Sequence, residues 1–194
     1  MNLVLFRMIN SMAYKSSFLD FIMIFYSTVV PYIYILFLSI CFIRGVVKKD
    51  RVLRGNIVAT GVFTAMCMAI NFIIGNVYFV KRPFVDHEVN LLVKHAPDAS
   101  FPSDHSAGTM AIALESRFRR RIIKTVLIIN ALLVGFSRIY VGNHYPADVL
   151  GAFAIVYFSR KIFDKYLRLH ILNYYNTFEK ILFKEKLRKA GSER

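Results

Sequence analysis

The sequence is poor in cysteine and in acidic residues, and both shortages exclude classes of protein. Its two cysteines, Cys41 and Cys67, stand inside apolar stretches, so we expect buried free thiols and no disulfide framework. There is no C-x-x-C pair, no zinc-ligand spacing and no acidic cluster, so we expect no metal and no other cofactor. The first 14 residues lack a long apolar core followed by small residues, and we expect no cleavable signal peptide.

The shortage of acids leaves a large positive charge. Lys and Arg number 26 against 12 Asp and Glu, a formal net charge of +14. Such a balance can indicate nucleic-acid binding. Here, however, the positive residues form short runs between apolar segments, which is typical of membrane topology and not of a DNA-reading face. We therefore expect no nucleic-acid partner.

Apolar residues make up 56% of the 194, in long runs, and this favours a polytopic membrane helix bundle of the all-α class. We predict about five transmembrane helices, at 18–43, 57–80, 103–118, 122–141 and 146–163. The single domain, 1–194, would comprise an amphipathic interfacial helix (1–14), the transmembrane core (18–163) and a basic, amphipathic tail (164–194). At ~1.5 Å per residue the third span is shorter than the ~30 Å hydrocarbon core, so its start should be recessed.

The distribution of positive charge predicts the orientation. Residues 44–54 and 117–124 each hold five Lys or Arg, and ten more follow from position 160, together 20 of the 26. Five spans place all three groups on one side, which the positive-inside rule makes cytoplasmic. The C-terminal tail would then be cytoplasmic, and the two polar motifs described next would face outside.

The first polar motif, Ser103-Asp104-His105, follows Pro102 at the start of the third predicted span. It could be only a helix start, with Ser103 as the cap and Asp104 at the positive end of the helix. It could instead bind phosphate through backbone N–H groups and the Ser103 hydroxyl, with His105 moving protons. Because a carboxylate repels phosphate, we expect the Asp104 side chain to point away.

The second polar motif ends in His144 and Asp148. Asp148 could simply be a favourable acid in the first turn of a helix opened by Pro146, and His144 a loop residue. Alternatively, Asp148 accepts a hydrogen bond from one ring nitrogen of His144 and leaves the other nitrogen as a nucleophile.

Two arginines support the second interpretation. Arg138 and Arg82 lie at the edges of predicted spans, where a cation is costly without an anionic partner. Each would offer a planar donor fork to phosphate oxygens.

Together these motifs resemble the type-2 phosphatidic-acid phosphatase superfamily, whose motifs are Lys-x6-Arg-Pro, Pro-Ser-Gly-His and Ser-Arg-x5-His-x3-Asp. Residues 137–148 match the third motif in full, and the second has Asp104 in place of glycine. Of the first motif only Arg82-Pro83 is present, because position 75 is glycine; Lys81 is the neighbouring lysine. The Phe-Pro-Ser-Asp-His form, preceded by His-Ala-Pro-Asp-Ala-Ser, is similar to the BcrC-type undecaprenyl-pyrophosphate phosphatases.

The resemblance implies an enzyme, a metal-independent lipid phosphatase, and assigns roles to residues. His144 would attack the terminal phosphorus, Asp148 would orient it, and His105 would protonate the leaving oxygen and then activate water. The implied phosphate-binding residues are Arg82, Ser103, Asp104, Arg138 and Lys81. No metal is implied, since fixed positive charge can do its work.

The implied substrate is undecaprenyl or another polyprenyl diphosphate, cleaved on the outer face of the membrane so that carrier lipid is recycled for cell-wall synthesis. This activity would be linked to bacitracin resistance. The alternatives are a phosphatidylglycerol phosphate or phosphatidate phosphatase and, outside the enzymes, a small transporter or a lipid-binding module. The expected partners are lipids. The oligomeric state is not predicted.

Overall fold

The computed structural model describes residues 1–118 and 120–192, with side chains as far as residue 181, and in this part of the chain it contains helices and no strands. The helices are α1 (Asn2–Asn10), α2 (Ser17–Thr28), α3 (Val30–Val47), α4 (Arg51–Val77), α5 (Pro83–Asp86), α6 (Asp104–Glu115), α7 (Arg121–Tyr140), α8 (Pro146–Tyr166) and α9 (Arg168–Ser192). The all-α class predicted from the sequence is therefore confirmed.

Three of the described helices, α3, α4 and α7, are long and apolar enough to cross a membrane. The first predicted span is divided between α2 and α3, which meet at Val29, because Pro31 stands in the first turn of α3 and breaks the run. The second predicted span begins earlier than expected: the Asp50 carboxylate accepts a hydrogen bond from the Leu53 N–H (2.9 Å) and caps α4 inside the basic stretch. The membrane crossings predicted for the segments that form α6 and α8 remain predictions.

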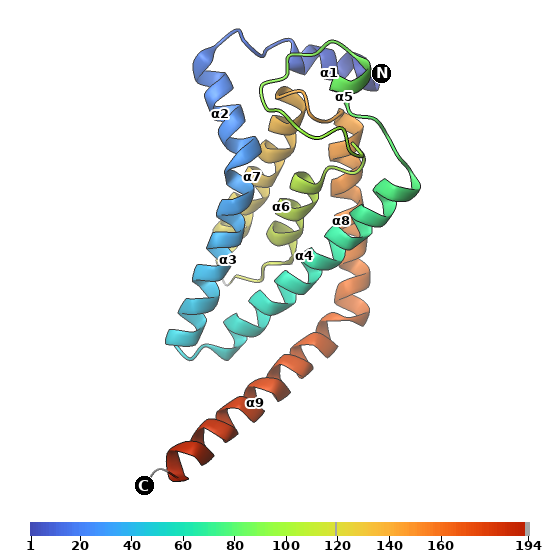
Figure 1. Ribbon diagram of the computed structural model, residues 1–194. Helices are drawn as coiled ribbons and strands as arrows, with labels where there is room; N and C mark the ends of the chain where they lie inside the picture. Colours follow the sequence, from blue (N-terminus) through green and yellow to red (C-terminus); the bar gives the residue numbers. More distant parts are fainter. Residues whose placement is uncertain (119, 193–194) are drawn as a thin grey trace.

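The short helix α6 lies at the centre of the bundle, packed against α4, α7 and α8 (Figure 1). Its side chains Ala107, Ala111 and Ala113 are fully buried, and such small residues let neighbouring helices approach closely. Helices α7 and α8 also meet tightly, since a Cβ on Gly135 would lie 2.6 Å from Val149. With 12 residues, α6 is about 18 Å long and shorter than its neighbours α7 and α8, and its N-cap Ser103 is fully buried, so its N-terminus lies inside the bundle.

One end of the bundle carries α1, α5 and the loop from 87 to 103, while α9 leaves from the other end (Figure 1). Helix α1 is more than a surface helix, because Phe6 is buried and its ring packs edge-on against Tyr145 (5.5 Å between centroids). The Asn10 side chain donates to the carbonyl groups of Asn90 and Tyr140 (2.8 and 2.9 Å). The interfacial helix predicted for 1–14 thus fixes the loop over this end of the bundle.

The tail predicted from residue 164 begins as part of the fold. Helix α8 continues to Tyr166, and α9 then packs along α4. Glu115, fully buried, pairs with Arg160 (3.1 Å) and Arg168, and Glu179 pairs with Arg54. Removing one partner of such a buried pair is strongly destabilising, so the contacts of Arg168 and Glu179 hold α9 in place.

Candidate active site

The predicted motifs meet at the end of the bundle where α6 begins, α7 ends and α8 begins. The turn from α7 to α8 holds His144 rigidly, since the Arg138 carbonyl accepts the N–H groups of both Asn143 and His144 (3.1 and 3.2 Å). Gly142 has φ +92°, and a Cβ there would lie 2.8 Å from the Asn90 carbonyl oxygen, which explains the glycine inside this motif.

His144 is buried and both its ring nitrogens are engaged. The Arg82 Nη1 lies 2.9 Å from Nε2, and because a guanidinium can only donate, Nε2 must be the unprotonated acceptor. The Nδ1–H then donates to the Ser100 carbonyl oxygen (2.8 Å). The geometry therefore defines the tautomer in which Nε2 carries the lone pair that a nucleophile needs.

The environment of His144 favours its neutral form. Burial, and then the nearby Arg138 and Arg82 guanidinium groups, hold the pKa of His144 well below its usual 6.5. At neutral pH the imidazole is therefore uncharged.

Asp148 reaches His144 indirectly. Its Oδ2 lies 3.7 Å from Nδ1, too far for a hydrogen bond, and instead accepts the Ser100 hydroxyl (2.5 Å) and the Tyr145 N–H (2.8 Å). The expected direct hydrogen bond between Asp148 and His144 is thus replaced by a connection through Ser100, whose carbonyl holds the ring and whose hydroxyl holds the carboxylate. Asp148 also lies in the first turn of α8, where an acid is favourable. It can therefore stabilise the start of the helix and also act on His144 through Ser100.

Two arginines lie beside His144. Arg82 is buried and donates from Nε to Asp98 (2.7 Å), from Nη1 to the Asn143 carbonyl (3.1 Å) and from Nη2 to the Ala99 carbonyl (3.2 Å). Arg138 is also buried, but only its Nη1 is paired, with the Ser27 hydroxyl (2.9 Å). Its Nε and Nη2 have no hydrogen-bond partner among the described residues. Buried unpaired guanidinium donors are costly, and an anion would satisfy them.

Ser103 and His105 lie at the start of α6. Ser103 is buried, its hydroxyl 2.9 Å from the Ser106 hydroxyl, and its N–H donates to the Asp148 carbonyl (3.2 Å). His105 is half-buried in the first turn. The Asp104 carboxylate accepts the Asn71 amide of α4 (3.1 Å), so its side chain is directed to α4.

Lys81 is not brought to the site. Its ammonium group is exposed and pairs with Asp86 (3.0 Å). The structure therefore does not support its predicted phosphate contact. Successive side chains on extended backbone point in opposite directions, and because Arg82 is buried, the Lys81 side chain points to the surface.

Sequence reasoning missed four residues that the fold adds: Ser100, Asp98, His95 and Ser27. Three of them belong to the segment His-Ala-Pro-Asp-Ala-Ser before the first polar motif, so a signal was present there. Ser27 lies in the middle of an apolar run, and only the packing of α2 against α7 shows its contact with Arg138.

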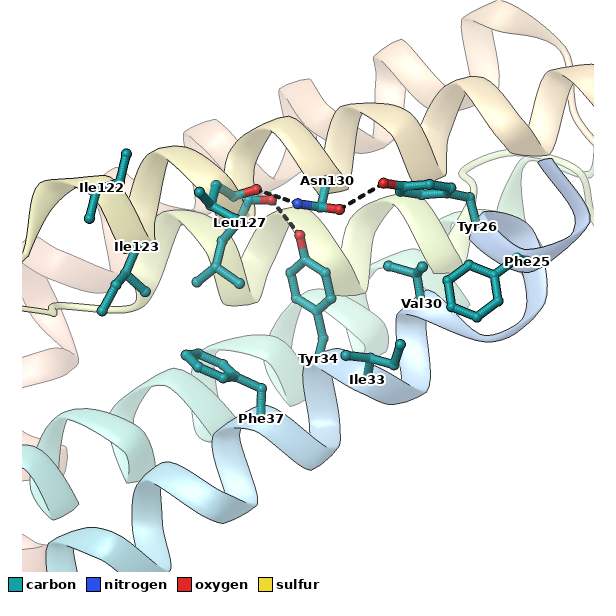
Figure 2. Close-up of a pocket in the computed structure, with 11 residues that line it drawn as sticks. Phe25, Tyr26, Val30, Ile33, Tyr34, Phe37, Ile122, Ile123, Leu127 and Asn130 are labelled. Atoms are coloured by element: carbon teal, nitrogen blue, oxygen red, sulfur yellow. Dashed lines mark hydrogen bonds between the residues drawn. The ribbon is translucent and has the colours of Figure 1, made fainter. Parts of the chain in front are cut away.

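An apolar groove of about 460 Å³ lies between α2–α3 and α7 (Figure 2). Two tyrosines reach across it: the Tyr26 hydroxyl donates to the Asn130 side chain (3.1 Å), and the Tyr34 hydroxyl donates to the Leu127 carbonyl. Tyr26 and Asn130, which line the groove, stand on the same two helices as Ser27 and Arg138, so the groove and the site share α2 and α7.

This fold and this set of residues define a family. Residues 56–165, more than half of the chain, match the PAP2 superfamily, and the chain belongs to it. Together with its long apolar helices, this makes it a membrane protein. The family resemblance inferred from the motifs is confirmed.

Particular relatives are also similar over most of the chain. The chain is 41% identical over 155 residues to undecaprenyl-diphosphatase BcrC of Bacillus subtilis (strain 168), covering 80% of this chain and 78% of that protein. It is 27% identical over 150 residues to the bacitracin transport permease protein BcrC of Bacillus licheniformis, covering 77% and 72%. The crystal structure of Aquifex aeolicus LpxE matches with a TM-score of 0.66 at 30% identity, covering 85% of this chain and 95% of that chain.

Proposed function

We propose that the protein is an undecaprenyl (polyprenyl) diphosphatase that releases the terminal phosphate through a phosphohistidine on His144. The observation that carries this proposal is that one site contains both a neutral, oriented imidazole and two guanidinium nitrogens of Arg138 that lack hydrogen-bond partners. A nucleophile and an anion site are thus adjacent, which is what phosphoryl transfer requires. The identity to undecaprenyl-diphosphatase BcrC supports the choice of substrate.

In the first step the Nε2 lone pair of His144 attacks the terminal phosphorus. The bond from phosphorus to the bridging oxygen breaks, its electron pair goes to the leaving lipid phosphate, and His105 supplies a proton to that oxygen. In the empty site Arg82 donates to Nε2, so an entering phosphate must take over this N–H before attack. Arg82, Arg138 and Ser103 then hold the non-bridging oxygens.

In the second step water attacks the phosphohistidine. His105 accepts a proton from the water, the bond from Nε2 to phosphorus breaks, and inorganic phosphate leaves. While the phosphoryl group is attached, the imidazole retains its Nδ1–H and is positive, and the buried Asp148 carboxylate 3.7 Å away offsets that charge.

The rest of the substrate is a long apolar chain. We include in the proposal that part of this chain lies in the groove between α2–α3 and α7, because the groove is apolar and is built on α2 and α7, the helices that carry Ser27 and Arg138. The excess of positive charge at the opposite end supports a site that faces outside, with the C-terminal tail cytoplasmic.

The test is phosphate release by the purified protein in detergent from undecaprenyl diphosphate, phosphatidylglycerol phosphate and phosphatidate, with and without EDTA. We expect the highest kcat/KM for the diphosphate, inhibition by vanadate and full activity in EDTA. His144→Ala should be inactive, and His170→Ala on the exposed part of α9 serves as the control. Preference for either glycerolipid would replace the proposed substrate by the alternative one, and no release from any of the three would refute the enzyme.

A further inference from the structure

A third histidine, His95, lies at the site and has no role in the two steps above. It belongs to the loop between α5 and α6, and its ring centroid is 6.5 Å from that of His144 with the planes at 69°. Its side chain is 24% exposed, so it lies at the mouth of the site and not in the core.

The hydrogen bonds around His95 connect it to the other site residues. Its Nδ1 lies 3.2 Å from the Ala96 carbonyl oxygen and 3.5 Å from Asp98 Oδ1. The same Asp98 oxygen accepts Arg82 Nε (2.7 Å), and Arg82 donates in turn to His144. Because Nδ1 faces two oxygens, Nε2 is the nitrogen of His95 that can meet a ligand.

The loop that carries His95 occupies the space near position 75, where the first motif of the family has a lysine and this chain has Gly75. A Cβ on Gly75 would lie 3.3 Å from the Ala99 Cβ and 3.5 Å from the Phe101 carbonyl oxygen. The position of the family lysine therefore lies against the loop that carries His95.

We propose that His95 binds an oxygen of the substrate's phosphate through Nε2, beside Arg82 and Arg138, and takes up a proton as it does so. This inference rests on the proposed function, because it concerns a phosphate bound next to His144. It gives the site a third group that can become positive, in a chain whose position 75 lacks the family lysine.

The charges around His95 support the proton uptake. In the empty site, burial, followed by Arg82, lowers the pKa of His95 below its usual 6.5, with Arg138 acting in the same direction and Asp98 against it. The neighbouring His105 and His144 are the other titratable groups that face it. A bound phosphate would cancel the effect of the arginines and raise the pKa of His95, since an opposite charge favours the protonated form.

The experiment measures binding of inorganic phosphate to the full chain in detergent by titration calorimetry, which needs no turnover. Repeating it at one pH in buffers of different ionisation enthalpy gives the number of protons taken up. His95→Gln keeps a hydrogen-bond donor but cannot gain a proton, His95→Lys carries a permanent charge, and His87→Gln, in the same loop, is the control.

We expect His95→Gln to bind phosphate roughly 10-fold more weakly, because a neutral amide N–H makes a weaker hydrogen bond to phosphate than a charged imidazolium does, and to take up fewer protons than the wild type. His95→Lys should restore the affinity without the proton uptake, which also shows that the site remains folded. His87→Gln should match the wild type.

Equal affinity and equal proton uptake in the wild type and His95→Gln would overturn the assignment of His95, even if His144→Ala is inactive and the proposed function stands. Conversely, a wild type that binds phosphate with His95-dependent proton uptake but hydrolyses no lipid phosphate would refute the proposed function alone.

Discussion

Replacing Asp148 by asparagine removes one charge from the site and little else. The amide oxygen can still accept from the Ser100 hydroxyl and the Tyr145 N–H, so the shape of the site is kept. What is lost is the attraction between a carboxylate and the positive phosphohistidine. At the observed 3.7 Å between Asp148 Oδ2 and His144 Nδ1, and at an effective dielectric constant of about 20, this is worth about 4 kcal/mol.

Since the positive charge on His144 develops only during the reaction, the loss should appear in kcat as a decrease of about 10³-fold, with KM unchanged or lower. Ser100→Ala should behave differently. It removes one hydrogen bond to a buried carboxylate and destabilises the protein by about 1.5–3 kcal/mol. Its backbone carbonyl still holds the His144 Nδ1–H, so activity should fall only about 10-fold, the low end for the loss of such a bond.

The assay is phosphate release from undecaprenyl diphosphate in detergent, with thermal unfolding measured on the same samples. Ser159→Ala, a nearly buried serine farther along α8, is the matched control and should lose little activity. A decrease in kcat of less than about 10-fold for Asp148→Asn would refute the electrostatic role, because the attraction of about 4 kcal/mol arises from that charge. Equal losses in Asp148→Asn and Ser100→Ala would instead show that orientation through Ser100 is what matters.

The apolar groove, the membrane orientation and the pKa of His144 can each be tested separately. Val126→Trp fills the apolar groove and should lower kcat/KM for undecaprenyl diphosphate at least several-fold more than for farnesyl diphosphate, because a bulky side chain overfills the site. Ile129→Trp, on the exposed side of α7, should change kcat/KM for neither lipid. Equal effects of Val126→Trp on both lipids would exclude the groove as the binding site of the lipid chain. In a cysteine-free background, Glu88→Cys should react with an impermeant thiol reagent on whole cells and Lys48→Cys should not, and the reverse labelling would invert the proposed orientation. Because the lowered pKa of His144 keeps it neutral as the pH falls, kcat/KM should not decline on acidification until the pH is below 6.5, and an earlier decline that His144 causes would contradict the assigned environment.

The helices could be predicted from the sequence because their signals are local. Apolar runs of helical length and Pro146 at the start of α8 gave the main elements. The packing of α9 on α4 could not be predicted from the sequence, because a basic amphipathic helix can lie on a membrane surface or on a protein surface. Only the partners, such as Glu179 beside Arg54, decide between the two, and they are distant in sequence.

The site was predictable where its chemistry is encoded in short motifs. His144, Asp148, Arg138, Arg82, Ser103 and His105 do come together, although their roles remain predictions. What the sequence could not give is how they connect. Ser100 stands between His144 and Asp148 through one hydroxyl and one carbonyl, and backbone groups leave no signature in a sequence. Lys81 was wrongly assigned to the site because it is next to Arg82 in the sequence. Neighbouring side chains on extended backbone point in opposite directions, and Lys81 pairs with Asp86 at the surface.

In the proposed mechanism, phosphate passes through a covalent bond to His144. The most direct measurement is an acid-free quench of the protein during turnover of substrate labelled at the terminal phosphate, followed by mapping of the labelled peptide. We expect label that is lost in acid and retained in base, located on His144, and absent from His144→Ala. Label on any other residue, or turnover in His144→Ala at the wild-type rate, would contradict it.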